Sequence, residues 1–206
     1  MEKVVLATGN PHKVKEILPL LEDLRFSVKL QTDFFNEEVE EDGLSFIENA
    51  IKKARFASQK TGLPAIGDDS GLEVFYLNGE PGIYSARYAS DGQSGYTSDS
   101  LNNEKLLQRL KGVPYKDRKA CYFCAMAYVR SATDATPLIS MGKWCGEILT
   151  EVRTSYGVGY DPIMWIPDYF KTAADIPLEI KNQVSHRAQA LNGLIKKIER
   201  NRNDRT

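Results

Sequence analysis

The stretch VVLATGNPHK, residues 4–13, decides how the fold begins. Its four apolar residues, Val4–Ala7, predict a short buried strand. Asn10 is a favourable N-cap and Pro11 suits the first position of a helix, so we expect a helix to start there. The strand therefore leads directly into a helix N-terminus, where free backbone N–H groups and the positive end of the helix dipole favour an anion.

The same turn carries candidate phosphate-binding residues. Thr8, Gly9 and Asn10 connect the strand to the helix, and Lys13 adds a positive charge one turn into the helix. The alternative is an ordinary capped turn with a solvated lysine. The turn is not a Walker A loop, because it has no second glycine followed by Lys and then Ser or Thr.

Hydrophobic periodicity and capping residues predict the elements that follow. In order they are a strand at 26–30, a helix from the capping box Ser45–Glu48 to about Thr61, strands at 119–130 and 137–144, and helices at 177–183 and after Ser185. This order predicts an α/β fold with a mixed central sheet and helices on both faces, in one domain over residues 1–206. A second lobe is expected at about 115–167, with an active-site cleft between the two lobes.

Composition favours a small-molecule ligand. The chain has 206 residues, 42% of them hydrophobic, and a net charge of −1. This is enough apolar material for a compact core, but there is no broad basic surface for a nucleic-acid polymer. No apolar window reaches the length of a membrane span, and no secretory segment is present, so we expect a cytoplasmic protein without a membrane partner.

The three cysteines are expected to be buried free thiols. Cys121 and Cys124 lie three apart in a predicted strand, where their side chains point to opposite faces, and Cys145 makes the number odd. The two histidines, His12 and His186, are too few for a histidine zinc site.

Asp68 and Asp69 are the strongest candidates for chemistry. They lie in the stretch Gly67–Gly71, which we expect to be a tight turn that separates a very short strand from the next one. Adjacent carboxylates repel each other unless a cation or a proton relieves them, and oxygen ligands suit Mg²⁺ that arrives with a phosphate substrate. The alternative is a plain polar turn.

A second group of polar residues precedes the C-terminal helix. Ser185 is a candidate N-cap, His186 and Arg187 are hydrogen-bond donors at the helix start, and Lys181 lies one turn earlier. Arginine offers a planar fork for a phosphate or a base edge. The alternative is a capped helix with surface side chains.

Together these motifs identify a resemblance to the Ham1-like family, also called the inosine triphosphatase or noncanonical purine pyrophosphatase family. The likeness spans nearly the whole chain. The matching pieces are LATGNPHK (6–13), EEDGLSFIENAIKKA (40–54), PAIGDDSGLEV (64–74), PGIYSARY (81–88), GYDPI (159–163) and KNQVSHRAQAL (181–191).

The resemblance implies a homodimer and assigns roles to residues. Mg²⁺ would be held by Glu41 with Asp68 or Asp69, although Glu38 and Glu40 compete with Glu41 for that role. Asp69 would be the general base. The substrate-binding set would be Thr8, Gly9, Asn10, Lys13, Lys53, Ser70, Val158, Gly159, Tyr160, Asp161, Lys181, His186 and Arg187.

The implied function is a Mg²⁺-dependent nucleoside triphosphate pyrophosphatase. It would cleave noncanonical purine nucleotides such as ITP, dITP and XTP to the monophosphate and pyrophosphate. Two alternatives stay open. One is a Maf-like pyrophosphatase for modified nucleotides, and the other is a nucleotide-sensing protein that has lost catalysis.

One position departs from the family pattern. The family usually has Phe before Gly-Tyr-Asp-Pro, where the ring would stack on the base, but this chain has Val158. Tyr156 is the nearest aromatic residue that could replace the missing ring.

Overall fold

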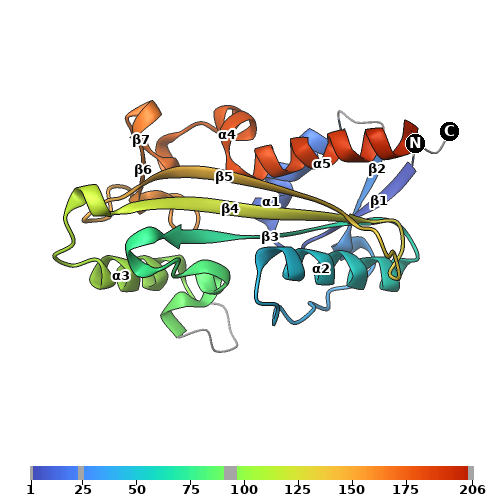
Figure 1. Ribbon diagram of the computed structural model, residues 1–206, viewed down its shortest axis with the longest axis horizontal. Helices are drawn as coiled ribbons and strands as arrows, with labels where there is room; N and C mark the ends of the chain where they lie inside the picture. The colour runs from blue at the N-terminus through green and yellow to red at the C-terminus, as the bar shows by residue number, and fades with distance from the viewer. Residues whose placement is uncertain (1, 23–25, 91–96, 204–206) are drawn as a thin grey trace. The chain divides into compact units, whose positions relative to one another are not determined.

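The computed structural model describes residues 2–22, 26–90 and 97–203 (Figure 1). Its strands are β1 (Glu2–Ala7), β2 (Phe26–Leu30), β3 (Ala65–Val74), β4 (Lys119–Val129), β5 (Leu138–Ile148), β6 (Met164–Ile166) and β7 (Lys171–Thr172). Its α-helices are α1 (Pro11–Glu22), α2 (Phe46–Thr61), α3 (Asp99–Arg109), α4 (Leu178–Val184) and α5 (His186–Asn203). None of the helices in these ranges is long and apolar enough to cross a membrane.

The strands form one mixed sheet in the order β2-β1-β3-β4-β5-β6-β7. β1 pairs in parallel with β2 and β3, whereas β6 pairs antiparallel with β5 and β7. β4 and β5 are neighbours joined by a short turn, which only antiparallel strands allow. The predicted mixed α/β sheet is therefore confirmed.

The chain divides into two compact units. Unit 1 comprises Met1–Ser70, Cys124–Lys143 and Asn182–Thr206, and unit 2 comprises Gly71–Phe123 and Trp144–Lys181. These bounds differ from the lobe expected at 115–167. The reason is that β4 and β5 are long: their connected ends belong to unit 1 and their other ends to unit 2.

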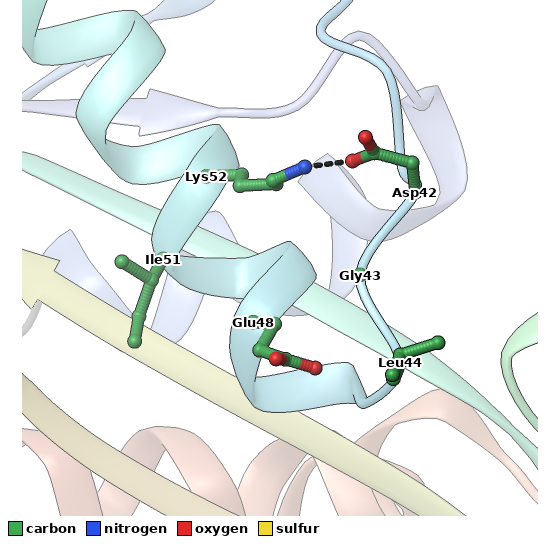
Figure 2. Close-up of a pocket in the computed structure, with 6 residues that line it drawn as sticks. All are labelled: Asp42, Gly43, Leu44, Glu48, Ile51 and Lys52. Carbon is green, nitrogen blue, oxygen red and sulfur yellow. Dashed lines mark ion pairs between the residues drawn. The ribbon is translucent and has the colours of Figure 1, made fainter.

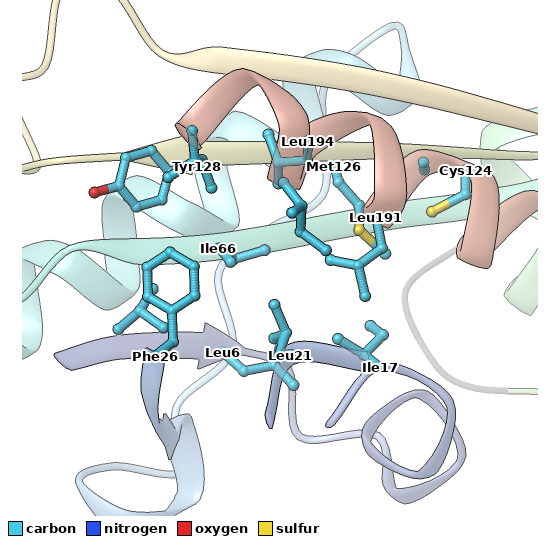
Figure 3. Packing of buried hydrophobic residues seen from close by; sticks show 14 residues of the cluster. Leu6, Ile17, Leu21, Phe26, Ile66, Cys124, Met126, Tyr128, Leu191 and Leu194 are labelled. Atoms are coloured by element: carbon cyan, nitrogen blue, oxygen red, sulfur yellow. The ribbon is translucent and has the colours of Figure 1, made fainter. Parts of the chain in front are cut away.

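Unit 1 has helices on both faces of its strands. Figure 1 shows α5 and α1 on one side of β1 and β3, with α2 on the other. Apolar side chains of α1, α5 and the strands form a buried core that includes Leu6, Ile17, Ile66, Met126 and Leu191 (Figure 3). Burial of this apolar surface holds the two helices to the sheet.

The predicted helix starts are confirmed. The Asn10 side chain accepts a hydrogen bond from the His12 backbone N–H at 2.9 Å, which caps α1. Ser45 caps α2, since the Glu48 backbone N–H donates to Ser45 Oγ at 3.2 Å, and Ser45 Oγ in turn donates to the Glu48 carboxylate at 2.9 Å. Ser185 caps α5 through the Ala188 backbone N–H.

The turn expected at Gly67–Gly71 is wrong, because β3 continues through these residues without a break. Gly67 serves close packing instead. A Cβ atom there would lie 2.4 Å from the Ala50 carbonyl oxygen and 2.6 Å from the Ala54 backbone nitrogen, both in α2. Glycine thus lets α2 lie directly against the extended strand, a role that sequence reasoning confuses with a turn.

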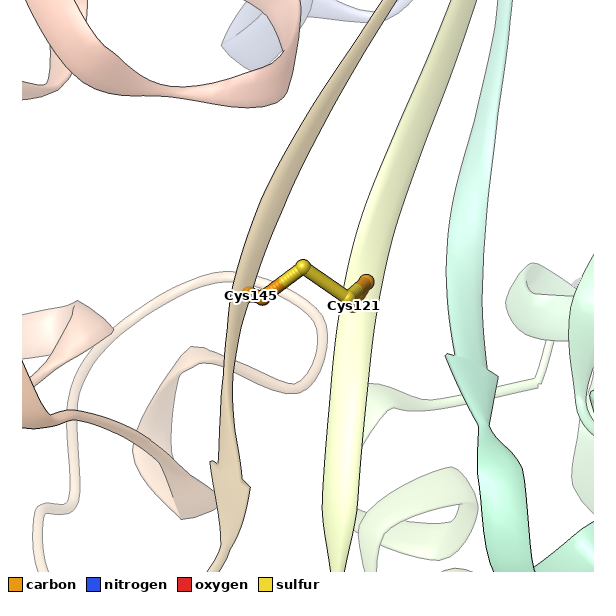
Figure 4. The surroundings of a disulfide bond; sticks show 2 residues. All are labelled: Cys121 and Cys145. Atoms are coloured by element: carbon orange, nitrogen blue, oxygen red, sulfur yellow. A yellow bond between two sulfur atoms is a disulfide. The ribbon is translucent and has the colours of Figure 1, made fainter.

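The prediction of three free thiols is wrong for two of them. Cys121 in β4 and Cys145 in β5 form a disulfide between the neighbouring strands (Figure 4). Cys124 is free and buried, as predicted. Spacing along one strand could not reveal this pair, because the partner of Cys121 comes 24 residues later, from the next strand of the sheet.

Candidate active site

Five charged residues of unit 1 form what we call the carboxylate–lysine cluster: Lys13, Glu41, Lys53, Asp68 and Asp69. Lys13 projects from the first turns of α1, Lys53 from the middle of α2, and both aspartates from β3. Glu41 lies in the irregular segment before α2. Each carboxylate lies against a lysine, so the cluster is a network of alternating charges.

The distances within the cluster are short. Lys13 Nζ lies 2.8 Å from Asp68 Oδ2, and Lys53 Nζ lies 2.7 Å from Glu41 Oε1 and 3.4 Å from Asp69 Oδ1. Lys53 also donates to the backbone carbonyl of Asp68 at 3.1 Å. Because the side chains of Lys13, Lys53 and both aspartates are largely buried, these interactions are weakly screened by solvent.

Side chains alternate between the two faces of a strand, and this explains why the neighbouring Asp68 and Asp69 contact different helices. Successive side chains of β3 point to opposite faces. Asp68 accordingly reaches Lys13 of α1, while Asp69 reaches Lys53 and Asn49 of α2. Asn49 Nδ2 donates to Asp69 Oδ2 at 3.0 Å and holds that carboxylate in place.

The two aspartates have opposite pKa shifts. Burial would raise the pKa of Asp68, but the charges of Lys13, Lys53 and Arg187 outweigh it and hold that pKa below its usual value. For Asp69, burial raises the pKa, and the nearby charge of Glu41 adds to the increase against the opposing effect of Lys53. One carboxylate is thus held ionised, while its neighbour is the stronger base.

The lysine between the acids is held as a cation. Burial alone would lower the pKa of Lys53, but Asp69, Glu41 and Asp68 raise it above its usual value. The pKa of Glu41 is lowered, because Lys53 and Lys13 outweigh the effect of its burial. These charges therefore persist at neutral pH.

Arg187 adds a third cation next to Asp68. It comes from the first turn of α5, its side chain is largely buried, and it donates to the carboxylate of Glu16 in α1 and to Ser70 Oγ at 3.2 Å. Its pKa lies above the usual value: burial opposes the shift, but Glu16 outweighs it. His186, the residue before it, is also buried.

The predicted phosphate-binding turn, Thr8–Asn10, connects β1 to α1 as expected and comes just before Lys13 in the sequence. Thr8 is buried, and its hydroxyl accepts the backbone N–H of Asn10 at 3.2 Å, while Gly9 and Asn10 are exposed. Of the three acidic candidates before α2, Glu38 and Glu40 are exposed, and only Glu41 is paired with Lys53.

The predicted metal ligands are not gathered into a ready-made metal site. In the described part of the chain, no three His, Cys, Asp or Glu side chains form a group that could hold a metal ion. One observation does fit a cation. Asp68 Oδ1 is buried, and among the described residues it has no hydrogen-bond partner. A magnesium ion needs only one or two protein carboxylates when substrate phosphates and water complete its shell.

A second cluster lies in unit 2 and contains the other predicted residues. Lys181 Nζ in α4 lies 2.6 Å from Asp161 Oδ2, and the hydroxyl of Tyr122 in β4 donates to Asp161 Oδ1 at 2.9 Å. We call Tyr122, Asp161 and Lys181 the Asp161 triad. Asp161 ends the predicted substrate segment, Val158–Asp161, and begins a single 3₁₀ turn, Asp161–Ile163.

That segment, Val158–Asp161, is held by its neighbours in unit 2. The backbone N–H of Gly159 donates to Asp99 Oδ2 at 2.7 Å, and its carbonyl accepts from Asn103 Nδ2 at 3.0 Å, both in α3. Gly159 has a φ of 58°, which favours glycine. Tyr160 is buried and donates to the carbonyl of Ser85 at 2.8 Å.

Sequence reasoning missed several residues in and around the two clusters. They are Glu16 and Asn49 in unit 1, and Asp99, Asn103 and Tyr122 in unit 2. Asn49 carried a usable signal, because a polar residue within the buried stripe of a helix needs a partner. The others had none, since their partners are distant in the sequence.

A pocket of about 330 Å³ opens at the start of α2, and none of the predicted site residues is among the residues that line it (Figure 2). It is lined by Asp42, Gly43, Leu44, Glu48, Ile51 and Lys52. Lys52 forms an ion pair with Asp42 in its wall. Two of the charged residues that line this pocket therefore neutralise each other.

The fold and the two clusters define an α/β protein in which lysines are paired with carboxylates in each unit. Comparison with known proteins agrees with this class. A sequence model described as the Ham1 family matches residues 4–197. The chain belongs to the Ham1 family, as the motifs predicted.

Individual relatives cover nearly the whole chain. A dITP/XTP pyrophosphatase of Vibrio cholerae is 50% identical over 202 residues, covering 98% of this chain and 99% of the relative. One of Yersinia pseudotuberculosis is 53% identical over 191 residues, covering 93% and 95%. The solved structure of a HAM1 protein from Coxiella burnetii has a TM-score of 0.87 and 42% identity, covering 97% of this chain and all of that one.

Proposed function

We propose that this protein hydrolyses noncanonical purine nucleoside triphosphates, namely ITP, dITP and XTP, to the monophosphate and pyrophosphate. Such an enzyme removes these nucleotides from the cellular pool. The activity named for its relatives supports the proposal. The structural observation that carries it is the carboxylate–lysine cluster, which pairs largely buried lysines with buried aspartates next to a helix N-terminus.

We assign the triphosphate to this cluster. Lys13 and Lys53 would neutralise phosphate oxygens, and the Thr8–Asn10 turn would add backbone N–H groups at the start of α1. Arg187 would contribute a planar fork, with Ser70 beside it. These groups bind charge that develops as the leaving pyrophosphate departs.

The charges of the cluster and its arginine argue for a divalent cation as part of the substrate complex. Lys13, Lys53 and Arg187 supply three positive charges, while Glu16, Glu41, Asp68 and Asp69 supply four negative ones. A bare triphosphate would meet a net negative site. Bound Mg²⁺, held by Asp68 with Glu41 or Asp69, would supply Lewis-acid stabilisation of phosphate oxygens.

Asp69 is the proposed general base. Its raised pKa makes it a stronger base than an exposed aspartate, and hydrogen bonds from Asn49 and the Ser70 backbone N–H hold its carboxylate in place. It would take a proton from the water that attacks the α-phosphorus. Lys53, close to both Asp69 and Glu41, would keep the two acids from repelling each other.

The base is assigned to Lys181 and the Val158–Asp161 segment, with His186 as a further donor. A Lys181 ammonium that faces O6 of inosine or xanthine would donate to it. Adenine has an amino group at that position, so the Lys181 ammonium would face another hydrogen-bond donor instead of an acceptor. This mismatch is the proposed source of selection against ATP.

A nucleotide panel tests the function. We expect purified protein with Mg²⁺ to release pyrophosphate from ITP, dITP and XTP, with kcat/KM for ATP and GTP lower by about 100-fold or more, which corresponds to about 2.7 kcal/mol. Chelation of the metal should abolish turnover and reloading should restore it. Orthophosphate as the first product, or equal use of ATP, would contradict the proposal.

The same panel separates the two alternatives. Preferential cleavage of modified pyrimidine or methylated triphosphates would favour a Maf-like enzyme. Tight nucleotide binding without turnover would favour a sensing protein. We also propose a homodimer that acts in the cytoplasm, as the family resemblance implies; light scattering in solution and cell fractionation test these two points.

A further inference from the structure

Tyr122 has no role in the proposed site so far, yet its hydroxyl is directed at one of that site's residues. The side chain lies in β4 and is only 7% exposed. A buried phenol requires a hydrogen-bond partner, and this one donates to Asp161 Oδ1 at 2.9 Å. Burial, together with the charge of Asp161, raises the pKa of Tyr122 well above its usual value. The hydroxyl therefore keeps its proton and acts as a donor.

Asp161 is held from two sides. Tyr122 donates to one carboxylate oxygen, and Lys181 donates to the other at 2.6 Å. The terminal torsion of an aspartate is soft, so a carboxylate held at one oxygen can rotate. Two donors from separate elements, β4 and α4, fix its plane.

The position of Tyr122 is itself restrained. Its ring stacks on Trp144 of β5, with 6.5 Å between ring centroids and an angle of 29° between ring planes. The Cys121–Cys145 disulfide joins the residues next to this pair on the same two strands. A rigid hairpin thus presents the hydroxyl to Asp161.

The two bonds to Asp161 bear on Lys181. An ammonium group has three protons, and among the described residues the structure gives the Lys181 ammonium one hydrogen-bond partner, Asp161. Its remaining protons are suited to a carbonyl oxygen. How well such a donor distinguishes an oxygen from an amino group depends on how firmly it is placed.

We propose that Tyr122 is a specificity-determining positioning residue, whose hydroxyl fixes the Asp161 carboxylate and thereby the Lys181 ammonium that recognises the purine base. The inference rests on the proposed function, in which Asp161 and Lys181 bind the base. It adds a residue that contacts neither the base nor the phosphates in its assigned role.

Tyr122→Phe tests the inference, because it removes the hydroxyl and keeps the ring that stacks on Trp144. We expect KM for dITP to rise about 3- to 10-fold while kcat changes less than about 2-fold. The preference for dITP over dATP should fall by about the same 3- to 10-fold. This preference is a ratio measured on one sample, so partial misfolding of the variant does not affect it.

Tyr88→Phe is a matched control. Tyr88 is also a buried tyrosine of unit 2, and its hydroxyl donates to the carboxylate of Glu80 at 2.9 Å, a residue with no assigned role in the proposed site. It should leave KM and the preference for dITP unchanged.

A double-mutant cycle shows whether Tyr122 acts through Asp161. Asp161→Asn should lower the preference for dITP, and adding Tyr122→Phe should lower it no further. Additive effects, or an unchanged preference in Tyr122→Phe, would overturn the inference. If the wild-type protein releases no pyrophosphate from dITP, the proposed function itself fails, which is a separate result.

Discussion

Asp68 and Asp69 are adjacent residues with different surroundings. Because they alternate across β3, Asp68 lies against Lys13 with a lowered pKa, and Asp69 lies against Lys53 and Asn49 with a raised one. Environments that push the pKa values of two acids apart commonly separate their roles. This supports Asp68 as the ionised metal ligand and Asp69 as the base.

Asp69→Asn should lower kcat by a factor on the order of 10³ or more, because the amide cannot accept the proton of the attacking water. Pyrophosphate release from dITP is the measurement, and circular dichroism checks that the fold survives. Asp117→Asn, at an exposed aspartate, is the control. If Asp69→Asn kept more than about a tenth of the wild-type kcat, Asp69 would not be the base.

Val158→Phe should lower KM for ITP by roughly 3- to 30-fold with little change in kcat, because a ring in place of Val158 adds base stacking far from the reacting phosphorus. Val158 is 40% exposed, so a larger side chain has room. Steady-state kinetics with ITP provide the measurement.

Tyr156→Ala distinguishes the other explanation for this position. Tyr156 is 60% exposed, and its hydroxyl donates to Asp175. If KM for ITP is unchanged in Val158→Phe and ITP affinity is greatly reduced in Tyr156→Ala, the stacking role belongs to Tyr156. No effect from either variant would mean that the base is held elsewhere.

At the scale of elements, the turn between β4 and β5 depends on one buried carboxylate. Asp134 accepts hydrogen bonds from the backbone N–H and guanidinium of Arg130 and from the backbone N–H of Thr136. Its backbone carbonyl also accepts from Arg55 of α2 at 3.0 Å. The side chain of Asp134 is only 2% exposed, so these bonds are protected from water.

Stability should therefore depend on pH through Asp134. The hydrogen bond from Arg130 is the main reason that the pKa of Asp134 is lowered in the folded protein. A lowered carboxyl pKa stabilises the fold above the unfolded-state pKa of about 3.9, and this contribution is lost as the pH falls below that value. Asp134→Asn should cost about 2 kcal/mol at pH 7 and clearly less near pH 3.

Urea unfolding at both pH values measures this difference. The exposed Asp117→Asn serves again as the control and should change the free energy of unfolding little at either pH. A cost of Asp134→Asn that is equal at pH 7 and pH 3 would contradict an ionic role for Asp134.

At the scale of the whole molecule, the Cys121–Cys145 disulfide restricts the unfolded chain. It joins residues 24 apart in the sequence, and closing a loop of that length removes conformational entropy from the unfolded state. The cross-link should stabilise the protein by about 3 kcal/mol, within a usual range of about 2–4 kcal/mol.

Unfolding in urea with and without a thiol reductant tests the cross-link. Reductant should lower the free energy of unfolding of the wild-type protein. It should leave the free energy of unfolding of Cys145→Ser unchanged. Cys124→Ser should keep the sensitivity to reductant, because Cys124 is the free thiol. A wild-type protein insensitive to reductant would mean that the bond does not contribute to stability in solution.

The sequence by itself determined the features that depend on neighbouring residues. Asn10, Ser45 and Ser185 cap helices through bonds to residues two or three positions away, so the helix starts could be predicted. The family motifs likewise named Lys13, Asp68, Asp161 and Lys181 as candidate site residues, and the structure pairs Lys13 with Asp68 and Lys181 with Asp161.

Only the tertiary structure decided which distant residues meet. β3 runs continuously through the expected turn, with Gly67 packed against α2. The pairing of β4 with β5 brings Cys121 next to Cys145. Tyr122 lies in an apolar strand, and its local sequence does not indicate that its hydroxyl donates to Asp161. Apolar periodicity indicates that a side chain is buried, but its partner is fixed by how separate segments pack, which no local pattern encodes.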